Sequence, residues 1–136
     1  MKNSLDEMSY SRAVHFYTEN ERVIRAIRAL KDKDEEAFLK AINESRESST
    51  KNLKNMMVGN EYKGSPLEAC DLLMEACENH GAVKINGGGF AGSVIAVIPT
   101  SYLKPVISKM SKVYGKDNVK EIFVRPNGPT TLYTLK

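Results

Sequence analysis

Four glycines, at positions 87, 88, 89 and 92, lie within six residues of the stretch INGGGFAGSVIAVIP. Inside a regular element each glycine costs about 0.5–1 kcal/mol relative to alanine, so the cluster indicates a backbone that needs positive φ angles or a close approach by another group. Successive backbone amides in such a turn can face an anion. A tight hairpin with a bulge would use the same glycines, and these residues alone leave both interpretations open.

The glycine spacing also fits three phosphate-binding motifs, each of which fails on its context. The dinucleotide fingerprint must open a helix, whereas the apolar run after Gly92 predicts a strand. The protein-kinase loop has the right strand context, but no strand lysine, His-Arg-Asp loop or Asp-Phe-Gly follows it. A Walker loop needs a lysine after its last glycine, and Ser93 stands there.

Two histidines and two cysteines are the remaining candidates for site chemistry, and packing roles are favoured for all four. His15 has no carboxylate or nucleophile at useful spacing, and His80 precedes a glycine at a predicted helix end. Cys77 and His80 form one i, i+3 pair, which is a weak zinc signal. Cys70 and Cys77 lie about 10 Å apart along a predicted helix, beyond disulfide reach, so we expect free buried thiols.

Helical periodicity comes first along the chain. Apolar residues recur at helical spacing over nearly six turns of YSRAVHFYTENERVIRAIRALK, residues 10–31. Asp32 or Asp34 can cap a second helix, which fades through the polar residues 43–52. Ser65, Pro66 and Glu68 form a capping box that opens a third helix, expected to stop at Gly81. A fourth helix around residues 106–114 ends at Gly115.

Strand periodicity follows the third helix. Residues 82–86 and 93–98 flank the glycines, and the unbroken apolar run of the second strand predicts cover on both faces. Further strands are expected at 119–125 and 131–135, on either side of the turn at 126–129. The sequence therefore predicts a single α+β domain over residues 1–136, with helices on a largely antiparallel sheet of about four strands.

Composition and charge exclude several classes of function. The 136 residues are 41% hydrophobic and 27% charged, which suits one soluble domain. No stretch resembles a signal peptide or a membrane span, so we expect a cytoplasmic protein without a membrane partner. Residues 101–136 carry seven basic against two acidic side chains, which favours a solvated helix face over an anion site. No arginine-rich tract or aromatic ladder indicates nucleic-acid binding.

Several stretches together resemble one enzyme family. GAVKINGGGFAGSVIAVIP is similar to the third, C-terminal motif of galactokinases, in the GHMP family of small-molecule kinases. RAVHFYTENERV resembles the family's Arg-Ala-x-His and Glu-x-x-Arg-Val helix, and INESRESS its Asn/Ser-rich second helix. SPLEACDLLMEAC resembles its Pro-x-Leu helix, and FVRPNGPTTL its closing strand and turn. The resemblance runs from about Tyr10 to Leu132.

The resemblance implies the C-terminal domain of an ATP-dependent sugar kinase, with a ferredoxin-like four-stranded sheet. The family's N-terminal domain carries the sugar-recognition motif, the Ser-rich phosphate loop and the catalytic aspartate, and none of these is present here. We therefore expect no catalytic residue in this chain and no phosphoryl transfer by it alone. ATP and Mg²⁺ belong to the full enzyme, and the partners implied are the missing N-terminal domain and a sugar such as galactose. The resemblance places one wall of the active site at Gly87, Gly88, Gly89, Phe90, Ala91 and Gly92.

The chain departs from the family pattern at four positions. Lys84 stands for an arginine, Asn86 for threonine or serine, Ala91 for a glycine and Arg46 for a common histidine. Lysine keeps the charge without the bidentate fork, and alanine tolerates positive φ poorly. Two alternatives stay open: a free-standing ligand-binding or regulatory module, and an interaction domain that self-associates through an apolar face, with the first helix as the candidate.

Overall fold

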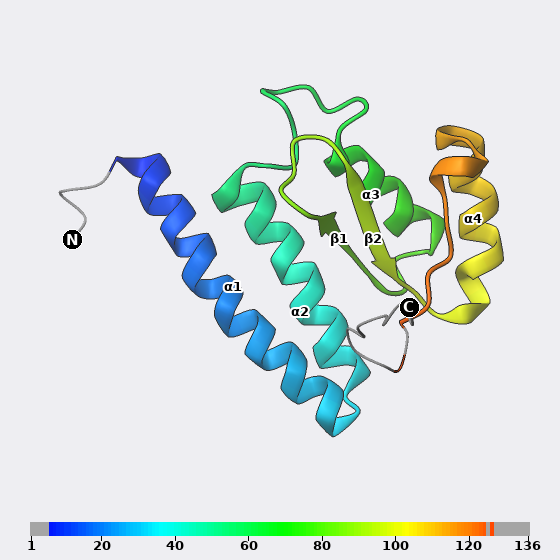
Figure 1. Ribbon diagram of the computed structural model, residues 1–136, viewed down its shortest axis with the longest axis horizontal. Helices are drawn as coiled ribbons and strands as arrows, with labels where there is room; N and C mark the ends of the chain where they lie inside the picture. The colour runs from blue at the N-terminus through cyan, green and yellow to red at the C-terminus, as the bar shows by residue number, and fades with distance from the viewer. Residues whose placement is uncertain (1–5, 125, 127–136) are drawn as a thin grey trace, which may run out of the picture.

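The computed structural model describes residues 6–124 and 126 as four helices and a β-hairpin (Figure 1). Two long helices lie side by side at one end, the hairpin and α3 occupy the middle, and α4 lies at the other end. The sequence therefore predicted the α+β class correctly. The elements are α1 (Glu7–Asp32), α2 (Glu35–Ser48), the π-helical turn η1 (Ser49–Leu53), α3 (Pro66–Ala76), β1 (Ala82–Asn86), β2 (Ser93–Val97), α4 (Thr100–Tyr114) and the 3-10 turn η2 (Lys116–Asn118).

The helix starts follow the capping residues that the sequence offers. The Asp34 carboxylate accepts the Ala37 amide at the start of α2, and the Ser65 hydroxyl accepts the Glu68 amide at the start of α3. Of the two aspartates predicted for α2, Asp34 is the cap. Such a side-chain cap satisfies a backbone donor that the first turn leaves open and is worth about 1 kcal/mol.

Three helix boundaries differ from the prediction. The second helix does not fade through its polar residues; it continues to Ser48 and then widens into η1. The third helix ends at Ala76 rather than near Gly81, because Glu78 and Asn79 both take left-handed backbone angles, with φ of 53° and 62°. The fourth begins at Thr100, ahead of Pro105.

α3 holds the hydrophobic core together. On one side Cys70 of α3 packs with Val83 and Ile85 of β1, together with Met56 from the segment before α3. On the other side α3 packs against α4 through Cys77, Val106 and Met110. Both cysteines are free and fully buried, as predicted.

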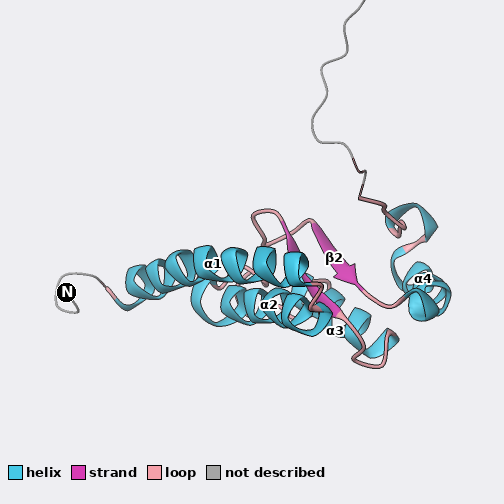
Figure 2. Ribbon diagram, turned by 90° about the horizontal axis from the view of Figure 1, so that it is seen from below, coloured by secondary structure: helices cyan, strands magenta, loops and turns pink. Residues whose placement is uncertain are grey.

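β1 and β2 pair antiparallel, with Ala82 opposite Val97 and Asn86 opposite Ser93. Figure 2 shows α3 below this hairpin, and Val94 and Ala96 pack toward the core beside it. The prediction that β2 is covered on both faces is wrong, because none of its residues is fully buried and Ser93 and Val97, at its two ends, are exposed.

The predicted four-stranded sheet is not seen in the described part of the chain. The sheet there has two strands, and residues 119–124 carry no strand where one was expected. Ile122, Phe123 and Val124 are exposed, so no neighbouring strand supports them. The expected strand at 131–135 and most of the turn at 126–129 lie outside the described residues.

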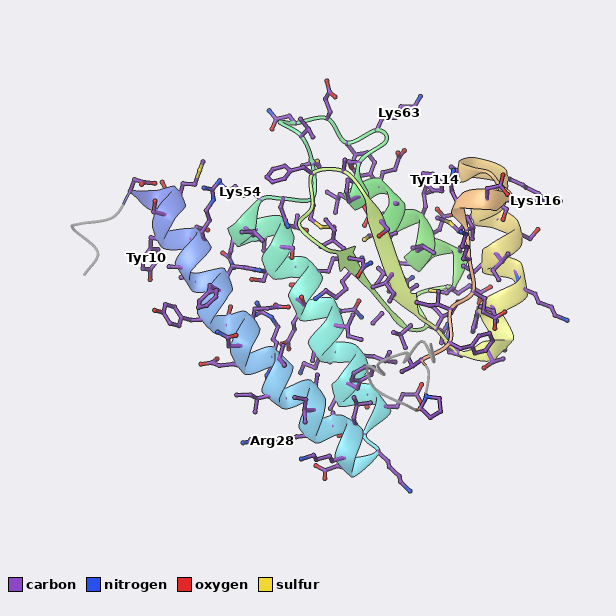
Figure 3. All side chains as sticks on the ribbon, in the orientation of Figure 1. Tyr10, Arg28, Lys54, Lys63, Tyr114 and Lys116 are labelled. Atoms are coloured by element: carbon purple, nitrogen blue, oxygen red, sulfur yellow. The ribbon has the colours of Figure 1, made fainter. Side chains whose placement is uncertain are left out.

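Within residues 6–124 and 126, no helix is long and apolar enough to cross a bilayer. The lysines at 104, 109, 112, 116 and 120 are all exposed, as expected of a solvated face. Figure 3 labels Tyr114 and Lys116 at this end of the molecule, beside α4.

Candidate functional site

The glycine-rich loop of residues 87–92 joins β1 to β2 and takes the unusual backbone angles that its composition predicts. Gly87, Gly89 and Gly92 have φ of 98°, 92° and 114°, backbone angles that residues other than glycine rarely adopt. Phe90 also has a positive φ, 62°, whereas Ala91 does not. Ala91, which stands for a family glycine, is therefore unstrained, and the unfavourable backbone angle falls on Phe90 instead.

Asn55, just after η1, fixes this loop from one side. Its backbone carbonyl accepts the Phe90 amide at 2.6 Å, and its Nδ2 donates to the Gly88 carbonyl at 3.0 Å. A Cβ at Gly89 would overlap the backbone and side chain of Asn55, so glycine there permits the close approach. The loop is thus anchored to the helical layer as well as to its own strands.

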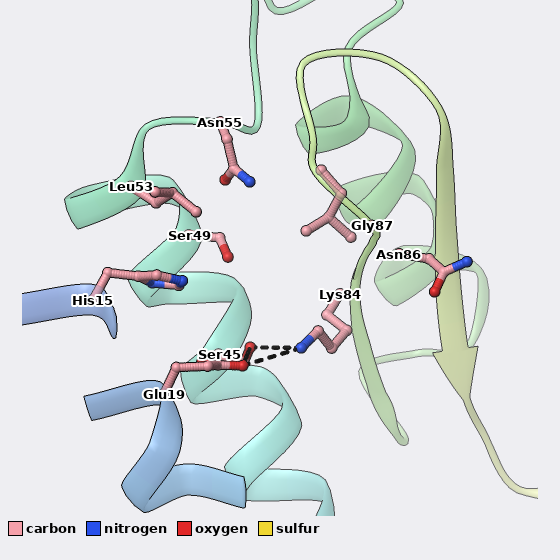
Figure 4. A pocket seen from close by; sticks show the side chains of 10 residues that line it. His15, Glu19, Ser45, Ser49, Leu53, Asn55, Lys84, Asn86 and Gly87 are labelled. Atoms are coloured by element: carbon pink, nitrogen blue, oxygen red, sulfur yellow. Dashed lines mark hydrogen bonds and ion pairs between the residues drawn. The ribbon is translucent and has the colours of Figure 1, made fainter. Parts of the chain in front are cut away.

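An open pocket of about 220 Å³ lies between the loop, β1 and the helices α1 and α2 (Figure 4). The structure records no hydrogen bond from the backbone amides of Gly87, Gly88 and Gly89 to any described residue. Of these three glycines, Gly87 lines the polar pocket. Its lining residues are His15, Glu19, Ser45, Ser49, Leu53, Asn55, Lys84, Ile85, Asn86 and Gly87.

A charged network forms the floor of this pocket. Lys84 Nζ on β1 lies 3.2 Å from Glu19 Oε1 on α1 and 2.8 Å from Ser45 Oγ on α2. Ser45 Oγ donates to Glu19 Oε1 at 2.6 Å, and Arg22 Nε donates to the other carboxylate oxygen at 2.8 Å. Burial alone would raise the pKa of Glu19, but the hydrogen bonds from Ser45 and Arg22, with Lys84 beside them, outweigh it and hold that pKa at about 2.

His15 lines the pocket one helical turn before Glu19. Its Nδ1 lies 3.0 Å from Ser48 Oγ, which also accepts a 3.1 Å bond from Asn52. Burial lowers the pKa of His15, and the Arg22 charge lowers it further against the opposing pull of Glu19. The lowered pKa favours the neutral imidazole, and its bond to Ser48 joins α1 to α2.

Two buried polar atoms of this region lack a partner within the described chain. They are Asn55 Oδ1, an acceptor on the pocket wall, and Arg22 Nη2, a donor. Asn55 is only 3% exposed. An orphaned buried acceptor costs about 1–3 kcal/mol unless another group satisfies it.

The remaining sequence candidates do not form a metal site. Cys77 is buried in the α3–α4 cluster, and burial raises the pKa of its thiol. The His80 ring stacks on Tyr102 with centroids 5.0 Å apart. Across the residues that the structure describes, no three His, Cys, Asp or Glu side chains gather where they could hold a metal ion.

Comparison with known proteins adds to this geometry. The chain is 28% identical over 120 residues to the galactokinase of Glaesserella parasuis serovar 5, covering 88% of this chain. It is 32% identical over 111 residues to that of Fusobacterium nucleatum, and 35% over 112 residues to that of Lactobacillus helveticus, each covering 80% of this chain. The chain is a relative of the galactokinases. No family model matches it.

The chain spans about a quarter to a third of the length of these galactokinases, 30% of the first and 26% of the other two. That share is consistent with a C-terminal portion of the enzyme, as the order of the motifs predicts. The departures from the family pattern now have positions in the fold. Lys84 makes single-point contacts with Glu19 and Ser45, and Arg46 Nη1 lies 3.8 Å from Asp71 Oδ1 on α3.

The sequence found the loop but missed the groups that hold it. Glu19 and Arg22 were visible as the Glu-x-x-Arg-Val helix, but nothing in their spacing showed that Glu19 meets Lys84 of β1. Asn55 carried no signal, because its role depends on η1 ending where Lys54 turns left-handed, with φ of 56°.

Proposed function

We propose that this chain is the C-terminal part of a galactokinase-type sugar kinase. In that enzyme the Gly87–Gly92 loop forms one wall of the site where a phosphoryl group passes from ATP to the 1-hydroxyl of the sugar. The similarity to galactokinases over 80–93% of the chain is the observation that carries the proposal. The anchored loop, with three amides that have no described partner, supports it, because such amides suit an anionic or hydroxyl-bearing group.

The rest of the enzyme supplies ATP binding, Mg²⁺ and the catalytic carboxylate in this proposal. The described residues bring no acidic cluster to the loop that would suit Mg²⁺. Phosphoryl transfer needs metal, nucleotide and acceptor held in line, and the loop offers backbone donors on one side only. The chain by itself is therefore inactive.

The proposal includes a larger sheet than the two strands described. Residues 119–125 and 131–135 would complete the four-stranded, ferredoxin-like arrangement. The exposed side chains of Ile122, Phe123 and Val124 support this, since a β-rich apolar run gains stability from a paired neighbour. Amide hydrogen exchange tests it: protected amides in both segments are expected, and exchange as fast as in an unfolded peptide would contradict the larger sheet.

A complementation assay tests the activity. We expect no galactose phosphorylation by the chain alone, and turnover when it is mixed with the Lactobacillus helveticus galactokinase truncated before its matching region. Gly88→Asp adds a charge where a side chain has open space, so it should reduce turnover of the mixture at least tenfold without unfolding the chain. Lys116→Asp, at the far end of the molecule, is the matched control. Robust turnover by the isolated chain would refute the division of labour.

A free-standing ligand-binding module is the second candidate. The pocket favours it, because polar side chains from α1, α2 and β1 line it and could bond a small polar ligand. Titration calorimetry with ATP, galactose and galactose phosphate separates the two. Micromolar affinity for the isolated chain would favour the module, and millimolar or absent affinity would count against it.

A further inference from the structure

The apolar stripe of α1 faces away from the rest of the molecule. The side of α1 that meets α2 and η1 is mostly polar, with Ser11 bonded to Asn52 and His15 to Ser48. Figure 3 shows Tyr10 projecting from the opposite side. Phe16 and Tyr17 are 63% and 69% exposed and touch edge to face. The stripe, here called the α1 stripe, consists of the partly buried Ala13 and seven exposed residues, with Asn20 at its centre: Tyr10, Phe16, Tyr17, Val23, Ile24, Ile27 and Leu30.

The size of the α1 stripe marks it as an interface. Aromatic side chains carry roughly 150–250 Å² each, so the exposed fractions give on the order of 700 Å² of apolar surface on one helix. Monomeric proteins rarely expose a contiguous apolar patch above a few hundred Å². A stable protein interface buries about 800 Å² per partner, which one helix face of this extent approaches.

The α1 stripe is symmetric about its polar centre. Asn20 lies next to the midpoint of Glu7–Asp32. Counting outward from it, apolar residues stand at three positions (Tyr17 and Val23), four (Phe16 and Ile24), seven (Ala13 and Ile27) and ten (Tyr10 and Leu30) in both directions. A surface that docks on its own copy around a two-fold axis must be self-complementary, and this palindromic spacing meets that requirement.

We propose that two copies of this chain pair through antiparallel α1 helices, with the two-fold axis passing beside Asn20. At 100° per residue, this register sets Tyr17 of one copy opposite Ile24 of the other, and Phe16 opposite Val23. The small Ala13 meets the larger Ile27, so the faces fit without overlap. The two Asn20 amides meet on the axis, where each donates to and accepts from the other.

Asn20 also explains why the register is unique. A single polar residue in an otherwise apolar helix seam fixes pairing, because any shift buries the amide against apolar groups without a partner. An unrelated apolar partner would not require an asparagine at the centre of the stripe or matched spacing on both sides of it. The second copy satisfies both features with residues already present.

Sedimentation velocity of the full chain and its variants tests the pairing. We expect a dimer at tens of micromolar, and at least tenfold weaker association for Tyr17→Glu and for Ile24→Lys, since each places an unpaired charge in the seam. Both positions are exposed, so circular dichroism should show unchanged folding. Val113→Lys, at an exposed apolar position on α4, is the matched control and should leave the dimer intact.

Mixing the two variants tests the register itself. In a mixed dimer the glutamate at position 17 faces the lysine at position 24, so an equimolar mixture of Tyr17→Glu and Ile24→Lys should regain dimer. A mixture of Tyr17→Glu with Val113→Lys should contain no more dimer than the two variants form separately. A monomeric wild type at these concentrations would overturn the proposal, and so would a dimer that neither variant weakens. Failure of the mixture to recover overturns the register, and capture of the stripe by the truncated galactokinase in place of a second copy overturns the choice of partner.

Discussion

The backbone carbonyl of Asn55 accepts a 2.6 Å hydrogen bond from the Phe90 amide, joining the end of the second helix to the tip of the glycine loop. The Asn55 side chain adds a second bond, from Nδ2 to the Gly88 carbonyl. Loops of this length and composition are mobile when only their strands hold them. Here a single residue binds both limbs of the loop, so the presentation of its amides depends on Asn55.

Replacing Asn55 should loosen the loop more than it destabilises the domain. Asn55→Ala removes the bond to Gly88 but keeps the carbonyl that binds Phe90, so we expect a loss of about 1 kcal/mol in the free energy of unfolding. Amide exchange at Phe90 and Ala91, the loop amides that have hydrogen-bond partners, should accelerate at least fivefold. Asn86→Ala, which removes an exposed bond to Ser93, is the control and should change stability by less than about 0.5 kcal/mol. Equal exchange rates in the two variants would contradict the anchoring role.

Neighbouring glycines of the loop should respond differently to the same substitution. Gly89→Ala forces a side chain into a backbone with φ of 92° and against Asn55, so urea unfolding should show a loss of about 1–3 kcal/mol. Gly88 has open space around it and no positive φ, so Gly88→Ala should be neutral or slightly stabilising. If both variants unfold at the same urea concentration, the loop does not hold the described geometry.

Sequence reasoning recovered the elements whose signals are local. Ser65 with Pro66 marked the start of α3, and the change of period placed β1 at residues 82–86 without error. Helix ends were harder, since Asn79 stops a helix only when its backbone turns left-handed, which the residue permits but does not require.

Long-range relations were beyond the sequence for a physical reason. The periodicity of α1 showed an apolar stripe, but a stripe carries no information about whether a neighbour in the same chain covers it. The contact of Lys84 with Glu19 spans 65 positions and depends on how α1, α2 and β1 pack. The unbroken apolar run of β2 suggested two covered faces, and the hairpin leaves one side short of cover because residues 119–124 do not pair with it.

The two cysteines should be inert in the folded protein. Burial raises the pKa of Cys70 to about 11, so almost no reactive thiolate forms there at pH 8. Burial also raises the pKa of Cys77, and both side chains are fully buried from reagents. Alkylation by iodoacetamide, followed by mass spectrometry, should be at least on the order of 100-fold slower in buffer than in denaturant. Free thiol counts should be two in denaturant without reductant. Fast native labelling of either residue would show that the α3 core opens.

Acid should weaken the domain through Glu19. Its folded pKa, about 2, lies below the ordinary value of 4.5, so the ionised carboxylate stabilises the fold above pH 4.5, and this stabilisation is lost as pH falls toward 2. Because the carboxylate is partly exposed and solvent screens its interactions, we expect it to contribute about 1–2 kcal/mol to the free energy of unfolding. Glu19→Gln keeps the shape but not the charge. Its unfolding free energy should lie below that of the wild type at pH 7 and converge on it near pH 2. Glu47→Gln, whose partner Lys51 is exposed, is the control and should follow the wild type. Parallel curves for wild type and Glu19→Gln across this range would show that the ion pair with Lys84 does not stabilise the packing of α1 and α2 on β1.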